Sequence, residues 1–142
     1  MANRTPMQPT TSDAVARRMI DRASAEARSL GVPVTIVVVD GSGVLKAMQR
    51  MDSAPLVSVQ TAINKAYAAA AIGMPPDNFY AAIESDAAAV AEFATRPGLA
   101  LIAGGLPVVV DSRVAGAIGV AGAMTGAQDR RIAETAVAHV TA

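Results

Sequence analysis

Between residues 12 and 30, apolar and polar positions alternate with the period of an α-helix. The apolar positions are Val15, Met19, Ile20, Ala23, Ala27 and Leu30. Ser12 stands where a side chain can cap the first backbone N–H groups, and Gly31 followed by Pro33 ends the pattern. The spacing predicts a helix from Ser12 to Leu30, preceded by a flexible segment over residues 1–11.

The pattern then changes to β-branched residues. Residues 34–39 read Val-Thr-Ile-Val-Val-Val, and a second apolar run covers residues 44–48. Between them lie Asp40, Gly41, Ser42 and Gly43, which are typical turn formers. This arrangement predicts a β-hairpin whose first strand is buried.

Helical spacing returns in the middle of the chain. The stretch 56–72 carries one seam of apolar residues and ends at Gly73. Pro76 suits the first turn of a helix over 77–83, and Ser85 can cap a further helical stretch that runs to Phe93. Residues 96–98, Arg-Pro-Gly, end that stretch.

The last third of the chain predicts more strands and one helix. Residues 99–102 suggest a short strand and 103–107 a loop, while 108–110 and 114–120 flank a turn and form a second hairpin. Apolar residues from Ile132 to Val140 predict a closing helix. The expected order is αββααβββα, an α/β (α+β) domain over 12–142 with a mainly antiparallel five-stranded sheet packed by helices.

Composition narrows the function classes. Twelve basic and twelve acidic residues cancel and form no basic run, which argues against a nucleic-acid partner. The absence of cysteine excludes disulfides and thiolate chemistry and favours a cytoplasmic location. The polar start and the lack of a long apolar run predict neither secretion nor membrane insertion.

Gly104 and Gly105, followed by Leu106, form the first candidate ligand-binding element. Two residues without side chains allow backbone N–H groups to face a carboxylate or phosphate. The alternative is a tight turn between strands.

Arg50 is a second candidate ligand-binding residue, because its planar guanidinium matches the geometry of a carboxylate. The alternative is that Arg50 forms a surface ion pair with Asp52.

Lys65 is the third candidate. Ser58, Thr61 and Lys65 lie at i, i+3 and i+7, which predicts a polar stripe on an otherwise apolar helix. Either this stripe is solvated, or Lys65 is partly desolvated among apolar neighbours and acts on a ligand. Tyr67 would orient a ligand or pack at a helix–sheet boundary. The single histidine, His139, is interpreted as a surface or interface residue, so no metal site is predicted.

Several short motifs occur together in order, and together they resemble the GlcG/HbpS-like haem-binding family, which includes haem-degrading and PduO C-terminal-like domains. They are residues 31–34, Val38-Val39-Asp40, Gly43, Arg50-Met51-Asp52, Ala54-Pro55, residues 64–67, residues 104–107, residues 116–120 and Gln128-Asp129. The resemblance implies a profilin-like or PAS-like sandwich, self-association to dimers, tetramers or octamers, and a tetrapyrrole ligand.

The chain departs from the family pattern at two places. Ile102-Ala103 replaces an aromatic residue and a proline before the two glycines, and Ala121 replaces a serine. Its histidine lies outside the matching motifs, so a haem cofactor, implied by the resemblance alone, would need Tyr, Lys, Met or Thr as iron ligand.

Three functions are compatible with these residues. The first is a small-molecule-binding protein in which Arg50, Lys65 and the glycine loop meet the carboxylates of haem or a related tetrapyrrole. The second is a small lyase, hydratase or isomerase in which Lys65 acts beside Asp52 on a carboxylated or carbonyl substrate. The third is an accessory subunit that serves oligomeric assembly.

Overall fold

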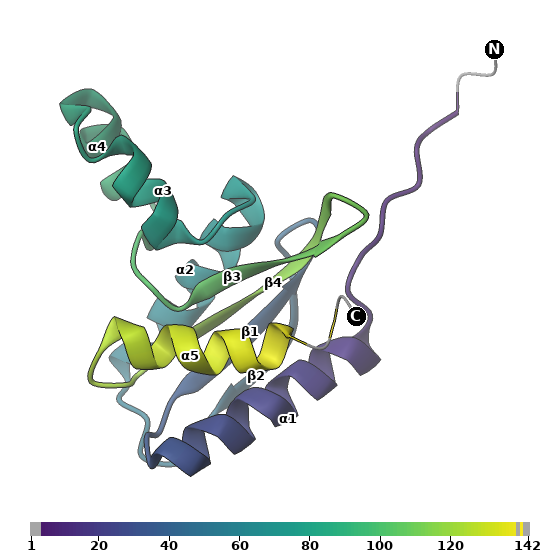
Figure 1. Cartoon of the computed structure of the whole chain (residues 1–142), viewed down its shortest axis with the longest axis vertical. Coiled ribbons are helices and arrows are strands. Elements are labelled where there is room, and N and C mark those ends of the chain that lie inside the picture. Colours follow the sequence, from purple (N-terminus) through teal and green to yellow (C-terminus); the bar gives the residue numbers. More distant parts are fainter. Residues whose placement is uncertain (1–3, 139, 141–142) are drawn as a thin grey trace.

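The computed structural model describes residues 4–138 and 140, and the interpretation of His139 lies outside them. Nine elements follow one another along the chain (Figure 1). They are α1 Asp13–Leu30, β1 Thr35–Asp40, β2 Leu45–Arg50, α2 Val57–Ile72, α3 Pro76–Ile83, α4 Ala87–Ala94, β3 Gly105–Val110, β4 Arg113–Ala121 and α5 Gly126–Val137.

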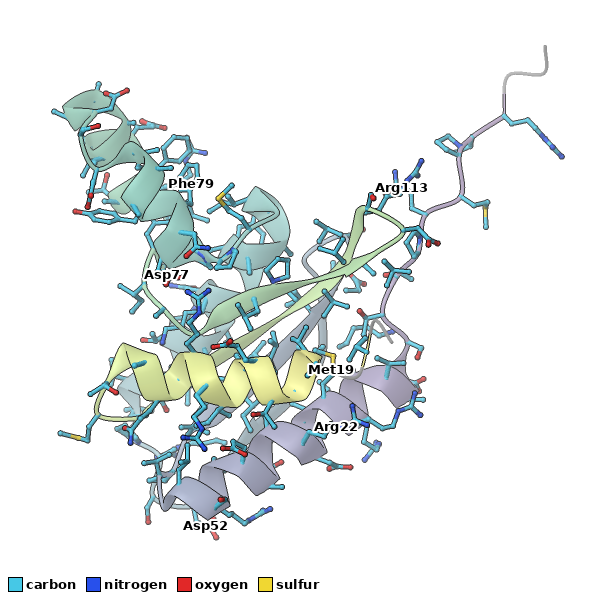
Figure 2. The ribbon with its side chains drawn as sticks, in the orientation of Figure 1. Met19, Arg22, Asp52, Asp77, Phe79 and Arg113 are labelled. Carbon is cyan, nitrogen blue, oxygen red and sulfur yellow. The ribbon has the colours of Figure 1, made fainter. Side chains whose placement is uncertain are left out.

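The predicted first helix is confirmed, and its ends have the expected causes. The Ser12 side chain accepts a hydrogen bond from the Val15 N–H at 3.2 Å, and Gly31 adopts a left-handed φ of 71° at the C-terminal end. The apolar stripe of α1 is buried; Met19 lies where α1 meets α5 (Figure 2). Thr11, just before the helix, donates through N–H and Oγ1 to the Ala115 carbonyl.

The strands form one antiparallel sheet in the order β2-β1-β4-β3. Helices α1 and α5 cover one face, and α2 covers the other (Figure 1). Side chains of β1 alternate between the two cores: Ile36 and Val38 pack on the α1–α5 side, and Val37 and Val39 on the α2 side. The α/β sandwich is therefore confirmed as three layers around a central sheet.

The predicted five strands and their order are wrong. The sheet has four strands and the order is αββαααββα. Residues 99–102 form no strand, and the two helical stretches predicted over 77–93, which the predicted order counted as one element, are separate helices. Gly105 to Val110 is a longer edge strand than predicted. Pro107 is tolerated there because an edge strand pairs on one side only and the missing N–H leaves no ladder partner unsatisfied.

Residues 99–102 lie outside the sheet, in the segment between α4 and β3. Leu99 lines a surface pocket together with Phe79 and Phe93. These two rings pack edge to face with their centroids 5.2 Å apart and hold α3 and α4 together. Asp86 caps α4 in place of Ser85 by accepting from the N–H groups of Ala88 and Ala89.

The α3–α4 unit projects from the sheet layers (Figure 1). Seven of the eight residues of α4 are apolar, yet none of them is buried. On α3, Asp77 forms an ion pair with Arg130 of α5 at 2.6 Å, which ties the base of the unit to the domain. Figure 2 shows Asp77 at the end of α3 that is nearer to α5. The unit is thus attached through α3, and α4 forms its distal part.

Helix α2 approaches the sheet very closely at Gly119 of β4. A Cβ atom at this position would overlap the Ala62 carbonyl and the backbone of Ala66. Small residues on both elements therefore set the distance between helix and sheet. This close approach carries the middle of α2, including Lys65, onto the end of β4.

Candidate functional site

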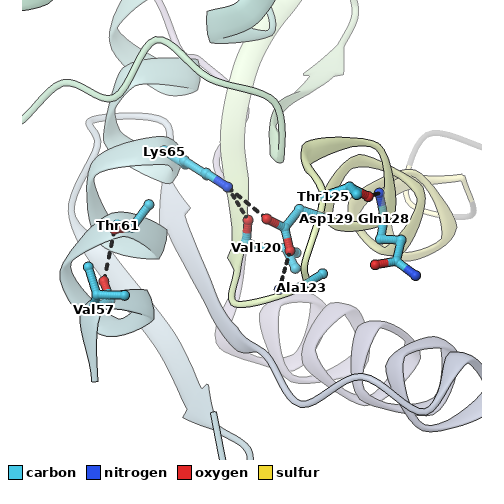
Figure 3. Close-up of polar contacts among 8 residues, drawn as sticks. All are labelled: Val57, Thr61, Lys65, Val120, Ala123, Thr125, Gln128 and Asp129. Atoms are coloured by element: carbon cyan, nitrogen blue, oxygen red, sulfur yellow. Dashed lines mark hydrogen bonds and ion pairs between the residues drawn. The ribbon is translucent and has the colours of Figure 1, made fainter. Parts of the chain in front are cut away.

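Lys65 is buried between α2, β4 and α5 with only 2% of its surface exposed. Its ammonium donates to the Val120 carbonyl at 2.9 Å and to Asp129 Oδ2 at 3.1 Å (Figure 3). Ser58, about two turns earlier on the same face of α2, is buried as well, and its hydroxyl donates to the Pro55 carbonyl. The interpretation of Ser58, Thr61 and Lys65 as a solvated stripe is therefore wrong; only Thr61 keeps partial exposure.

Asp129 completes this buried pair from the first turn of α5. Its Oδ1 accepts a hydrogen bond from the Ala123 N–H at 3.0 Å, while the Thr125 side chain caps the helix by accepting from Gln128 N–H (Figure 3). Burial raises the pKa of the Asp129 carboxyl above its ordinary value of 3.8, and attraction to Lys65 offsets only part of this effect. The site thus contains a carboxyl that holds its proton more strongly than usual.

The two glycines pack against the same lysine. Gly104 has a φ of +123°, and a Cβ there would crowd the Val120 carbonyl and Lys65 Nζ. A Cβ on Gly105 would crowd the Lys65 carbonyl. The glycine pair therefore makes room for Lys65 and its partner. Gly104 lies in a turn and Gly105 begins β3, but no strand directly precedes this turn, so the predicted turn between two strands is wrong. Leu106 points to the opposite side of the sheet, into the core with α1 and α5.

An open cleft of about 330 Å³ lies over this pair, and we call it the Lys65 cleft. Its floor contains Lys65, Asp129, Ser58 and Thr61. Its rim contains three exposed apolar side chains, with exposed fractions of 72% at Val57, 54% at Ile102 and 92% at Met124. The remaining lining residues are Pro55, Ala121, Gly122 and Ala123. Polar groups at the bottom and apolar groups at the mouth make the cleft amphipathic.

Arg50 and Asp52 lie elsewhere. The Arg50 guanidinium donates through Nε and Nη2 to the Ala54 carbonyl and so fixes the loop between β2 and α2. Both residues line a separate surface pocket of about 190 Å³ with Arg28, Gln49 and Met51. Asp52 is exposed in the turn that follows β2 (Figure 2). The acidic residue that the fold brings to Lys65 is Asp129.

Tyr67 faces a different groove, because two residues along a helix turn the side chain about 200° from Lys65. This groove, which we call the Tyr67 groove, measures about 350 Å³ and contains Val37, Val39, Leu45 and Ile63. Gly43 and Gly98 stand next to the Tyr67 ring. Within the described part of the chain, no charged side chain lines the Tyr67 groove.

Sequence reasoning did not identify Asp129 or Met124 as site residues. Asp129 appeared only as part of a family motif, although its place four residues after the helix-capping Thr125 is a local signal for the first turn. No local sequence signal connects either residue to Lys65, since 64 positions separate Lys65 from Asp129.

Across residues 4–138 and 140, no cluster of three potential metal ligands occurs, and no helix is long and apolar enough to cross a bilayer.

Comparison with known proteins places this geometry in a family. Residues 12–138 match the family described as haem-degrading protein HbpS-like. The chain belongs to the HbpS-like family. Two curated relatives agree: an uncharacterized 15.0 kDa protein of Citrobacter freundii is 35% identical over 95% of both chains, and protein GlcG of Escherichia coli K12 is 35% identical over 77% of this chain and 79% of its own.

Solved structures of the HbpS-like family share the fold. An HbpS double mutant from Streptomyces reticuli superposes with a TM-score of 0.89 at 25% identity, covering 100% of this chain and 94% of its own. A PduOC structure determined as a complex with haem has a TM-score of 0.83 at 28% identity, covering 91% and 94%. The GlcG/HbpS-like resemblance is thereby confirmed.

Proposed function

We propose that this protein binds haem or a related tetrapyrrole in the Lys65 cleft. The observation that carries the proposal is the amphipathic cleft itself: exposed Val57, Ile102 and Met124 surround a floor that contains a buried ammonium. A tetrapyrrole combines a flat apolar ring with carboxylates at one edge. The structural similarity to a PduOC haem complex supports the same ligand class.

Each part of such a ligand has a partner of matching chemistry in the cleft. The ring would remove the three exposed apolar side chains from water, which is the main driving force for binding. An ammonium has three donors, and Lys65 uses two of them for Val120 and Asp129. The third donor is the group available to a carboxylate, because the Thr61 hydroxyl already donates to the Val57 carbonyl. Arg50, fixed on Ala54, is left out of this site.

The Tyr67 groove is the rival location for an apolar ligand. It has a similar volume and more apolar lining, but its polar groups are the amides of Gln60 and Asn64 and the Tyr67 hydroxyl. Gln60 already donates to Asn64 at 2.8 Å. A dianionic ligand would therefore bury carboxylates there without a cation, which is strongly unfavourable. The charge of the ligand favours the Lys65 cleft.

Two matched variants distinguish the two sites. Ile102 and Leu45 have the same exposed fraction of 54%, and each lies at one site only. Haemin is titrated into wild-type protein, Ile102→Glu and Leu45→Glu, and binding is followed by the Soret band. We expect wild type and Leu45→Glu to bind alike and Ile102→Glu to bind much more weakly, because a carboxylate at the rim opposes both apolar contact and ligand charge.

Either of two results would overturn this proposal. The first is a wild-type protein that leaves the Soret band of haemin unchanged. The second is the reverse pattern, in which Leu45→Glu loses binding and Ile102→Glu keeps it, which would place the ligand in the Tyr67 groove. The mass and circular dichroism of each variant are measured to verify that it folds like the wild type.

Acid–base chemistry on a small carboxylated or carbonyl substrate is the second candidate function. The specific support is the Asp129 carboxyl, whose pKa is raised by burial and which touches the Lys65 ammonium in an accessible cleft. Asp129 takes the role that sequence reasoning assigned to Asp52. Substrate screening of wild type and Asp129→Asn tests this candidate: turnover that the variant retains in full would exclude it.

Self-association remains a prediction, and the α3–α4 unit is the surface that favours it. Its distal helix α4 is apolar along seven of eight residues without being buried in the single chain. Light scattering after size-exclusion chromatography measures the mass in solution. A monomer at all concentrations tested would contradict this prediction.

A further inference from the structure

Met124 combines a free side chain with a fixed backbone. It has an exposed fraction of 92% at the rim of the Lys65 cleft. On one side of it, Ala123 N–H donates to Asp129 Oδ1 at 3.0 Å; on the other, Thr125 caps α5. The buried Lys65–Asp129 pair thus anchors the loop that presents Met124. Its thioether lies at the cleft and is not buried in either hydrophobic core.

The other side chains in the cleft whose N or O atoms could ligate iron already form hydrogen bonds within the protein. Lys65 Nζ and Asp129 bind one another, the Thr61 hydroxyl donates to the Val57 carbonyl at 2.8 Å, and the Ser58 hydroxyl donates to Pro55 at 2.6 Å. Among the described residues that line the cleft, Met124 is the one that offers a soft sulfur donor. The full sequence contains no cysteine, so a thiolate cannot take this role.

A thioether has a definite effect on iron. It is a soft, neutral ligand, and as an axial ligand of haem it stabilises ferrous over ferric iron and raises the reduction potential. By contrast, a ring held only by apolar contacts and carboxylate pairing would bind equally well with or without its metal. Ligation by sulfur therefore predicts that the protein binds haem more tightly than metal-free protoporphyrin.

We propose that Met124 is the axial ligand of haem iron in the Lys65 cleft. This inference rests on the proposed haem-binding function and adds an identified ligand to it. Asp129 acts as a positioning residue, since its carboxylate holds the Ala123–Met124 loop at the rim. The site would select iron porphyrins and favour the ferrous state.

Met7 provides a matched control. It has the same exposed fraction of 92%, but it lies in the N-terminal segment, away from the residues of the cleft. Wild type, Met124→Leu, Met124→His and Met7→Leu are compared. Protoporphyrin IX binding is measured by fluorescence and haem binding by the Soret band; the spectrum and reduction potential of the bound haem are recorded.

We expect Met7→Leu to bind protoporphyrin IX like the wild type. Met124→Leu keeps an apolar side chain at the rim and should therefore lose more affinity for haem than for protoporphyrin IX. Met124→Leu should lose the thioether-ligated haem spectrum and shift the reduction potential to lower values. Met7→Leu should match wild type. Met124→His should restore a ligated spectrum with a nitrogen donor.

The outcomes separate the two proposals. If wild type binds neither porphyrin, haem binding itself is wrong and this inference falls with it. If wild type binds both, and Met124→Leu keeps the wild-type spectrum and potential, Met124 is not the ligand while the binding function stands. A Met7→Leu variant that loses the spectrum in place of Met124→Leu would also overturn the assignment.

Discussion

The ammonium nitrogen of Lys65 lies 3.1 Å from Oδ2 of Asp129, and only 2% and 7% of the two side chains are exposed. This contact joins the middle of α2 to the first turn of α5, and the Val120 carbonyl adds the end of β4. Burial of two charges costs desolvation energy, so such a pair adds little net stability when it is intact. Removal of one of the two residues, however, leaves the other charge buried without a partner.

Removal of Lys65 should therefore destabilise the protein strongly. We expect Lys65→Met to lower the free energy of unfolding by about 3–5 kcal/mol, because Asp129 loses its counter-charge in a buried site. Urea denaturation at neutral pH measures the change. The double variant Lys65→Met/Asp129→Leu should regain most of the loss, since it removes both charges; a double variant as unstable as the single one would contradict this account.

The raised pKa of Asp129 predicts a specific pH dependence. Between the unfolded pKa of 3.8 and the higher folded value, the folded state binds more protons than the unfolded state. The contribution of this carboxyl to stability is therefore most favourable below pH 3.8 and decreases as the pH rises through that window. Asp129→Asn should lack this component when the free energies of unfolding are compared across the window.

Direct titration provides an independent check of the same carboxyl. Carbon-detected NMR should show the Asp129 carboxyl titrating above its ordinary value, whereas Lys65→Met, which removes the attraction that lowers the pKa, should move it higher still. A midpoint at or below 3.8 in the wild type would refute the predicted direction.

Gly119 should tolerate no side chain. We expect Gly119→Ala to cost at least about 1–3 kcal/mol, because the new Cβ overlaps Ala62 and Ala66 of α2 and must push the helix away from the sheet. Gly31→Asn is the control: no atom lies within 4 Å of a Cβ there, and asparagine tolerates the left-handed φ of 71°. Thermal unfolding of both variants measures the contrast, and equal losses would argue against close packing.

The two helix caps should differ in their effect on global stability. Ser12→Ala removes the cap of α1, which packs in the core, and should lower the free energy of unfolding by about 0.5–2 kcal/mol. Asp86→Ala removes the cap of α4, which buries no residue. It should leave global unfolding nearly unchanged and accelerate hydrogen exchange of the α4 amides. Comparable global losses would show that α4 is coupled to the core.

Local patterns account for most of the elements. Ser12 and Gly31 bound α1 through capping and left-handed backbone, and the β-branched run at 34–39 became the strand buried on both faces. The errors in the strands concern residues 99–107. An apolar run can pair as a strand or lie against a helix, and its own composition does not distinguish the two. Leu99 lines a surface pocket with Phe79 and Phe93, and the edge strand begins at Gly105.

The sequence by itself determined the residue types, the helical and strand periodicities and the glycines that permit close approach, since these are properties of local backbone and side-chain chemistry. Only the tertiary structure decided which residues share a site. Lys65 meets Asp129 because α2 packs tightly on β4 at Gly119, and Arg50 and Asp52 are separated from Lys65 by the course of the loop before α2. Contacts between residues 64 positions apart depend on how the layers pack, and no local pattern encodes that distance.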